Sequence, residues 1–469
     1  ASVIVRSSGQ AEDAETESLA GHFTTIMNVS GDIELLAAIK KVVESFHNSN
    51  PNDQVFIQPM LENVSVSGVA FTRDPSNGGY YNIINYDDVS GQTNTVTDGQ
   101  SNDLNTYYHV KGSSLSSVCW LKNLINLLLE LEQFFNTDSL DVEFAVDRAG
   151  MLFLLQVRPL IINQTSTLSS SEQEQALLEI ENSFLSLSVK HPYLLGERSV
   201  FGVMPDWNPA EIVGVRPRPL ALSLYKELIT DSVWAYQRDN YGYRNLRSFP
   251  LLVSFAGLPY IDVRVSFNSF IASDLDNELA ERLVNHYIER LQDNPNHHDK
   301  VEFEIIYSCY TLDLPHRLSE LEDFGFNSEE QNEISESLRK LTNNIIHSKA
   351  GLWKKDIEKL DKLKIRQEKI QTSNLNEIEK IYWLLEDCKR YGTLPFAGLA
   401  RAGFIAVQLL KSLVRVDVLS ETEYECFMIG LDTISSGLSH DLKLLSRNLF
   451  LDKYGHLRPG TYDILSSRY

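Results

Sequence analysis

The segment 140–159 carries three polar side chains whose types suit metal and phosphate chemistry: Glu143, Gln156 and Arg158. Apolar and polar residues alternate along 140–147, an Arg-Ala-Gly turn follows, and a second apolar run leads to Arg158, which predicts a β-hairpin. A carboxylate and an amide on adjacent strands can hold Mg²⁺ through oxygen, and a guanidinium beside them can neutralise phosphate oxygens with its forked donors. A surface hairpin with polar residues facing water would show the same spacing, so the spacing alone leaves both interpretations open.

The elements that would position this hairpin are predicted upstream of it. A strand is expected at 54–60, and a strand, turn and strand at 69–86, where an Asp-Pro-Ser-Asn-Gly-Gly run forms the turn. The Leu-rich stretch 118–135 predicts an amphipathic helix. Another helix is expected to begin at Gly31-Asp32, with the apolar residues Ile33, Leu36, Ala37 and Val43 on one face.

Composition limits the classes of partner. The chain has 469 residues and a formal net charge of −22, which argues against a broad nucleic-acid or anionic-membrane surface because both need a basic face. The four cysteines form no CxxC pair, so a reducing, cytoplasmic environment is the expected one. No apolar run reaches the roughly 18 residues that a membrane helix needs, so no membrane partner is expected.

Four segments resemble the ATP-grasp domain of the phosphoenolpyruvate synthase and pyruvate phosphate dikinase family. They occur in the family's order over about the first third of the chain, and together they are more specific than any one of them alone. The segments are Val5-Arg6-Ser7-Ser8 with the following Ala11-Glu12-Asp13 and Ala20-Gly21, then Val69–Pro75, and finally the Asp141–Phe144 and Leu154–Pro159 parts of the hairpin. In addition, Gln58 in the strand Gln54–Met60 matches the family's adenine-side segment.

The resemblance implies a role for each matched residue. Glu143 and Gln156 would hold Mg²⁺, and Arg158 would contact the ATP phosphates together with Arg6. A loop that follows the Ala-Gly pair, containing Gly21 and Thr24, would close over the phosphates, and Gln58 would lie beside the adenine. The family usually has a Gly-Leu-Gly-Glu-type loop after the second of these strands. This chain has Asp87 and Asp88 there instead, so either residue replaces the acidic contact or the contact is lost.

The resemblance also predicts that parts of the machinery lie outside this chain. The family's first lobe and its Gly-rich loop with a lysine have no counterpart before Ala1. None of the eleven histidines lies in a Gly/Thr-rich loop of the kind that carries a phosphohistidine. We therefore expect the chain to be a piece of a longer protein, and a phosphohistidine domain of that parent protein to be one of its partners.

The second half resembles, more loosely, the central domain of rifampin phosphotransferase-like proteins. The resembling segments are Glu211–Gly214, Pro217–Leu220 and Tyr454–Ile464. In those relatives a largely helical domain holds the phosphoryl acceptor, which implies a small-molecule acceptor here. His456 and Arg458 are the candidate acceptor-binding residues, although a structural turn histidine is an alternative for His456.

The predicted fold class is α+β: a partial ATP-grasp domain with a mixed sheet at 1–162, a linker and helix at 163–194, and a mostly helical acceptor-binding domain at 195–469. The predicted function is ATP-dependent phosphotransfer that forms AMP and phosphate and passes a phosphoryl group through a histidine to the acceptor, with ATP and Mg²⁺ as cofactors. Two alternatives remain open at this point. The chain could be a non-catalytic nucleotide-binding or scaffold module of the same fold, or an ADP-forming ATP-grasp ligase.

Overall fold

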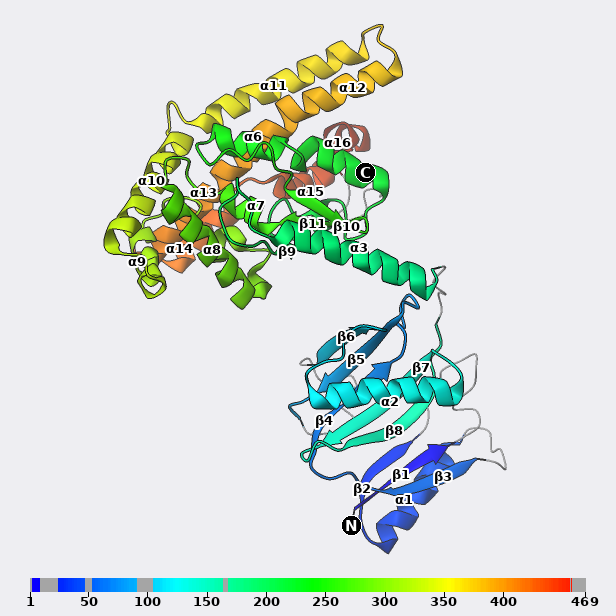
Figure 1. Ribbon diagram of the computed structural model, residues 1–469. Coiled ribbons are helices and arrows are strands. Elements are labelled where there is room, and N and C mark those ends of the chain that lie inside the picture. The colour runs from blue at the N-terminus through cyan, green and yellow to red at the C-terminus, as the bar shows by residue number, and fades with distance from the viewer. Residues whose placement is uncertain are drawn as a thin grey trace. The chain divides into compact units, whose positions relative to one another are not determined.

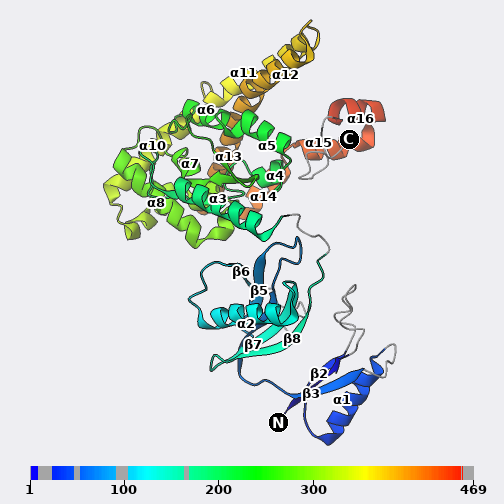
Figure 2. The same ribbon diagram turned by 45° about the vertical axis from the view of Figure 1, so that its right-hand side comes forward.

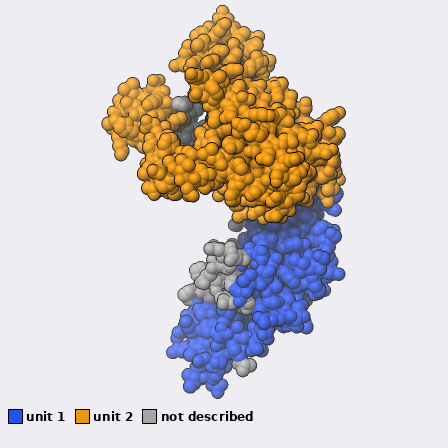
Figure 3. Space-filling view, turned by 90° about the vertical axis from the view of Figure 1, so that its left-hand side faces the viewer, with its two compact units in different colours: residues 1–178 blue, residues 179–469 orange. Residues whose placement is uncertain are grey.

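A computed structural model of the chain describes residues 2–8, 24–46, 53–90, 104–162, 168–455 and 457. The chain divides into two compact units, residues 1–178 and 179–469, which are coloured separately in Figure 3. The division falls inside one long helix, α3 (Ser170–Ser188). The described residues mix helices with antiparallel strand pairs, so the α+β class is confirmed, whereas the expected mixed sheet is wrong because no parallel pair occurs among them.

The first unit contains two sheets, each covered on one face by a helix (Figure 1, Figure 2). The smaller sheet has the order β2-β1-β3 and packs against α1; the larger has the order β6-β5-β4-β7-β8 and packs against α2. The element bounds are β1 Val3–Ser8, β2 Thr25–Val29, α1 Asp32–Glu44, β3 Gln54–Pro59, β4 Val64–Phe71, β5 Tyr81–Asp87, β6 Asn105–Val110, α2 Cys119–Phe135, β7 Leu140–Asp147 and β8 Leu152–Pro159.

Alternation along β7 explains how the larger sheet buries one face. Val142, Phe144 and Val146 are buried against α2, in a core with Leu124 and Leu128 of that helix. Asp147 to Gly150 form the turn, where Gly150 adopts a φ of 83° that favours glycine. The predicted hairpin is confirmed, and the helix predicted at 118–135 begins one residue later, at Cys119.

The helix predicted after Gly31 forms, but the apolar face predicted for it is exposed. Ile33, Leu36 and Val43 are 86%, 69% and 51% exposed, whereas Ala38 and Val42 are buried against the sheet. The sequence of α1 contains two overlapping apolar stripes at helical spacing. The sheet residues Val5 and Val29 pack on the second stripe and leave the first exposed.

Gly68 sits where the larger sheet has no room for a side chain. A Cβ there would lie 2.3 Å from the Asn85 carbonyl oxygen and 3.0 Å from the Phe144 ring. We predict that Gly68→Ala lowers the free energy of unfolding by about 2 kcal/mol or more, since overpacking displaces backbone as well as side chain. Gly150→Ala is the matched control, because its Cβ meets nothing within 4 Å and only the positive φ is strained. Urea unfolding of both variants tests this, and an equal loss in the two would contradict it.

The second unit is mostly helical around a small sheet of order β10-β11-β9. Its bounds are β9 Phe201–Gly202, α4 Pro209–Ile212, α5 Pro219–Tyr225, η1 Lys226–Thr230, α6 Val233–Asn240, β10 Leu252–Phe255, β11 Leu258–Asp262, α7 Val263–Asn268, α8 Asn277–Asp293, η2 Pro295–His297, η3 Val301–Ile305, α9 Leu314–Ser319, η4 Glu320–Phe324, α10 Ser328–Ile346, α11 Leu352–Gln371, α12 Glu377–Asp387, η5 Cys388–Thr393, α13 Leu394–Arg415, α14 Glu421–Ile429, α15 Ile434–Leu444 and α16 Arg447–Tyr454. Three of these, η1, η3 and η5, are π-helical.

Arg264 of the wholly buried α7 fixes the end of α3 in this unit. Its guanidinium donates to the carbonyl oxygens of Leu187 and Val189, at 3.0 Å and 2.7 Å. Carbonyls at a helix C-terminus lack partners within the helix, so an arginine can satisfy them.

One helix of the described chain is long and apolar enough to cross a membrane, so the expectation that there is none is wrong. The continuous helical stretch Glu377–Arg415 has an 18-residue window with a mean hydropathy of 1.4. Within it, however, α13 buries polar side chains that bond to the rest of the unit. Gln408 donates to the Glu302 carbonyl oxygen at 3.2 Å, and Ser412 accepts from the Leu312 amide at 3.2 Å. These contacts attach one face of α13 to the rest of the second unit, and 33% of the apolar window is buried.

Candidate nucleotide site

The predicted metal and phosphate residues share one face of the larger sheet, the face that α2 does not cover. Glu143 is paired directly with Gln156, and Asp141 with Arg158, in the antiparallel register of β7 and β8. Paired residues and residues two apart point to the same side of a sheet, so all four side chains lie on this face. A register shift after Glu143 keeps Gln156 and Arg158 on the same side as the two carboxylates.

Arg6 joins this group from the smaller sheet. Its Nη2 donates a hydrogen bond to Gln156 Oε1, so residues 150 positions apart in the sequence meet. Arg6 projects from the face of its own sheet opposite α1, because its neighbour Val5 is buried against that helix. The uncovered faces of the two sheets are therefore connected through an arginine and an amide, the two residue types predicted for phosphate and metal.

Asp141 was missed in the sequence, although it stands two residues before Glu143. Its Oδ2 accepts a hydrogen bond from Arg158 Nε at 2.7 Å, while its buried Oδ1 has no hydrogen-bond partner among the described residues. Binding through Nε fixes the guanidinium plane and leaves both terminal amino groups of Arg158 free of hydrogen bonds in the described chain. The alternation that predicted Glu143 on this face also predicts Asp141 there.

Burial makes the charged forms of both carboxylates unfavourable. It raises the pKa of Glu143, an effect that Arg158 and Arg6 partly oppose, and it raises the pKa of Asp141, which Arg158 again opposes. A carboxyl group in this condition gains from any further positive charge placed beside it. The face is therefore suited to a cation, provided that the cation brings water or phosphate oxygens as additional ligands.

The raised pKa values predict how stability depends on pH. A group whose pKa is higher in the folded state stabilises the fold below its unfolded pKa, here 4.5 for glutamate, and this contribution is lost as the pH rises through the folded pKa. Glu143→Gln removes the titration. We expect the variant to gain stability relative to the unsubstituted, metal-free chain as the pH rises above about 4.5 and through the raised pKa of Glu143, as measured by urea unfolding at each pH. A difference between the two proteins that stays constant with pH would contradict the assignment.

The other predicted residues are placed less centrally. Gln58 is exposed on β3, on the same face as Arg6, since it pairs with Ile4. The backbone amide of Thr24 donates to Ser45 Oγ at 3.4 Å, at the end of α1. Gly21 lies outside the described residues, as do His456 and Arg458. The binding roles of all these residues stay predictions.

The two acidic residues proposed to replace the family's loop carboxylate differ in position. Asp87 lies on the same face as Glu143, because it pairs with Ser67 on β4. Its Oδ1 accepts from the backbone amides of Val89 and Ser90, at 2.8 Å and 2.9 Å. Asp88 is exposed and accepts from Asn105 at 3.1 Å. Asp87 is thus placed on the same face as Glu143, but both of its carboxylate oxygens already accept hydrogen bonds from the following turn, Oδ2 from the Ser90 hydroxyl.

The donor set at this face fits Mg²⁺ in kind. Among the described residues, no group of three or more His, Cys, Asp or Glu side chains is placed to hold a metal ion. Mg²⁺ does not require such a group, since it usually binds one or two carboxylates and completes its shell with water and substrate phosphates. Glu143 and Gln156 would supply oxygen ligands, and the unpartnered Asp141 Oδ1 lies on the same face.

Comparison with known proteins gives a family match for the first part of the chain. Residues 1–120 match the model of the pyruvate phosphate dikinase AMP/ATP-binding domain. This match confirms the resemblance to the phosphoenolpyruvate synthase and pyruvate phosphate dikinase family over those residues, and it marks them as nucleotide-binding. The match ends before the β7–β8 hairpin. No curated protein matches the chain.

Proposed function

Taking the family match over residues 1–120 as its premise, we propose that this chain provides the ATP-binding and acceptor-binding parts of a dikinase-type phosphotransferase. The observation that carries the proposal is the meeting of Arg6, from the matched region, with Gln156 on the hairpin beyond it. Two arginines, two carboxylates and an amide at one place form a site for a metal-bound polyphosphate.

The chain's own residues would act by neutralising charge and holding the phosphates in line. Arg158, oriented through Nε by Asp141, would direct its terminal amino groups at phosphate oxygens, and Arg6 would do so from the other sheet. Mg²⁺, held by Glu143 and Gln156, would supply charge neutralisation. A histidine would attack the β-phosphorus and expel AMP, which leaves a pyrophosphoryl group on the histidine. Water would then cleave off the γ-phosphate and leave phosphohistidine, from which the phosphoryl group passes to a small-molecule acceptor in the second unit. Phosphoryl transfer depends mostly on such positioning and electrostatics.

A nucleotide-binding module without catalysis is the second candidate, because the Asp87 carboxylate is partly occupied by its own turn. An ADP-forming ligase is a third possibility that product analysis separates from the others. Incubation of the parent protein with ATP and acceptor should release AMP and phosphate under the main proposal. ADP would establish the ligase chemistry, and binding without either product would establish the module.

The first test is Mg²⁺-dependent nucleotide binding by this chain, measured by calorimetric titration of ATP with and without EDTA. We predict that Glu143→Gln raises the Kd for Mg·ATP at least ~10-fold, about 1.4 kcal/mol, and removes most of its dependence on Mg²⁺. Glu130→Gln is the control, since Glu130 is exposed on α2, which covers the opposite face of the sheet. Equal Mg·ATP affinity in the two variants would reject Glu143 as a ligand.

A further inference from the structure

The second unit contains a cavity of about 400 Å³ that no part of the proposed nucleotide site uses. It is formed by the segment 204–208, α6, η3 and α13, all of them in the second unit. Its volume falls at the lower end of the range that small-molecule pockets occupy. The arguments below concern what this cavity is built to hold.

Aromatic rings form much of the cavity wall. Trp207 faces Phe396 with ring centroids 6.2 Å apart, and Phe303 faces Phe404 at 5.5 Å. Phe396 and Phe404 are 59% and 41% exposed, so these large apolar groups are not packed into the core. Rings that border a cavity in this way favour a flat or apolar ligand, which would cover them.

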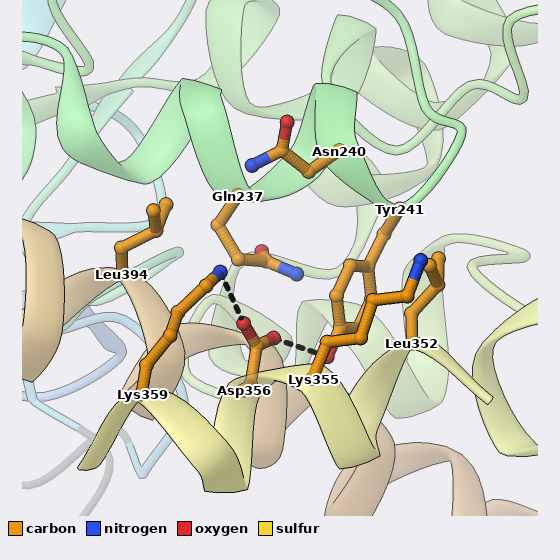
Figure 4. Close-up of a pocket in the computed structure, with 8 residues that line it drawn as sticks. All are labelled: Gln237, Asn240, Tyr241, Leu352, Lys355, Asp356, Lys359 and Leu394. Carbon is orange, nitrogen blue, oxygen red and sulfur yellow. Dashed lines mark hydrogen bonds and ion pairs between the residues drawn. The ribbon is translucent and has the colours of Figure 1, made fainter. Parts of the chain in front are cut away.

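A buried guanidinium in the cavity lining lacks acceptors. Arg401 is 3% exposed and forms an ion pair with Glu302, yet its Nε and Nη1 have no hydrogen-bond partner within the described chain. Gln237 borders this cavity and the neighbouring one, and Figure 4 shows its amide among the residues of the neighbouring cavity. Each buried donor left unsatisfied costs roughly 1–3 kcal/mol. The Arg401 donors are covered in this conformation, so a shift of the side chain toward a ligand oxygen atom would recover that energy.

The backbone at two residues beside the cavity has an unfavourable conformation, which a hydrogen bond from a buried side chain stabilises. Trp207 and Asn208 have φ values of 52° and 28°, which non-glycine residues rarely adopt. Tyr225, a buried residue, donates its hydroxyl to the Trp207 carbonyl oxygen. In addition, η3, which contributes Glu302 and Phe303, is π-helical, and such segments are frequent at functional sites. Strained or irregular backbone of this kind clusters at ligand sites.

A neighbouring cavity shows what a satisfied polar cluster looks like in the same unit (Figure 4). There Asp356 accepts from the Tyr241 hydroxyl at 2.6 Å and from Lys359 Nζ at 2.8 Å. This cavity is about 220 Å³, and Gln237 borders both. The hydrogen bonds of Asp356 link α11 to the end of α6, so this cluster has a structural role. Arg401 Nε and Nη1, by contrast, have no acceptor within the described chain.

We propose that the cavity of about 400 Å³ binds a small aromatic molecule through an acceptor oxygen, either a carboxylate or a carbonyl, that receives hydrogen bonds from Arg401. The rings of Trp207, Phe303, Phe396 and Phe404 contact the ligand ring. The proposal that this cavity binds a ligand depends only on residues of the second unit. The further step, that this ligand is the phosphoryl acceptor, rests on the proposed function.

The test uses three matched probes on the whole chain: 2-naphthoate, 2-acetylnaphthalene and 2-ethylnaphthalene. We expect the two oxygen-bearing probes to bind at least ~10-fold more tightly than the hydrocarbon, a difference of about 1.4 kcal/mol. Titrations are repeated with saturating Mg·ATP, which leaves the probe affinity unchanged if the two sites are distinct. Displacement of the probes by ATP, or equal affinity for all three, overturns the proposal.

Variants locate the site. Arg401→Met combined with Glu302→Gln leaves no unpaired buried charge, and it should remove the preference for the oxygen-bearing probes. Because that variant alters the core, Phe396→Ala at an exposed wall position serves as the second variant and should weaken binding of all three probes several-fold. Lys355→Met, at an exposed residue lining only the neighbouring cavity, should change nothing. Unaltered binding in both of the first two variants overturns the proposal, whatever the outcome of the ATP titrations.

Discussion

Arg158→Ala is expected to raise the Kd of this chain for Mg·ATP at least ~100-fold. The variant loses two charge-assisted hydrogen bonds to phosphate, and a hydrogen bond to a charged group contributes about 1.5–3 kcal/mol. Arg158→Lys keeps the charge but not the forked geometry or the contact through Nε, so we expect it to recover only part of the affinity. Calorimetric titration with Mg·ATP measures both variants.

The same substitution should also lower stability, because Asp141 would be left buried without its cation. The cost is on the order of 1–3 kcal/mol, since Arg158 is partly exposed. The double variant Arg158→Ala with Asp141→Asn separates the two effects. It should restore the free energy of unfolding but not the affinity for Mg·ATP. If the double variant regains affinity as well, Arg158 acts only by neutralising Asp141.

Disrupting the buried Asp206–Arg238 pair is expected to have the largest effect on the stability of the second unit. Arg238 Nη2 lies 3.1 Å and 3.2 Å from the two Asp206 oxygens, and Ser266 donates to Asp206 at 2.8 Å. Burial raises the pKa of the Asp206 carboxyl group above its usual value, and the nearby Arg238 guanidinium partly opposes this effect. Arg238→Met would leave an unpaired carboxylate in the core, which costs about 3–5 kcal/mol. Thermal or urea unfolding followed by a probe of the second unit measures the loss.

Two comparisons make this result interpretable. Arg339→Met breaks an exposed pair with Glu336, whose partners are 49% and 52% exposed, and should cost at most about 1 kcal/mol. The double variant Asp206→Leu with Arg238→Met should be less destabilised than Arg238→Met alone, because it leaves no buried charge. A double variant that loses as much as the sum of the two single variants would show that the two residues act independently.

The sequence by itself determined the local elements that carry the nucleotide site. A period of two along 140–147 sets which side chains of β7 face α2, and this places Glu143 and Asp141 together on the other face. The Asp-Arg-Ala-Gly turn sets the register next to it, which would place Leu155 opposite Glu143, and a register shift after Glu143 places Gln156 there instead. The hairpin and the two faces of β7 depend on neighbours within about twenty residues, so pattern and turn chemistry are sufficient to predict them, whereas the register shift was not predicted.

Only the tertiary structure decided which surfaces are covered and which charges are buried. The sheet residues Val5 and Val29 pack against the stripe of α1 that contains Ala38 and Val42. Arg6 meets Gln156 across 150 residues, and Arg401 is buried beside Glu302 in a helix whose composition resembles a membrane span. Burial and partnering are properties of long-range packing, because a side chain's pattern along its own helix or strand does not specify what packs against it.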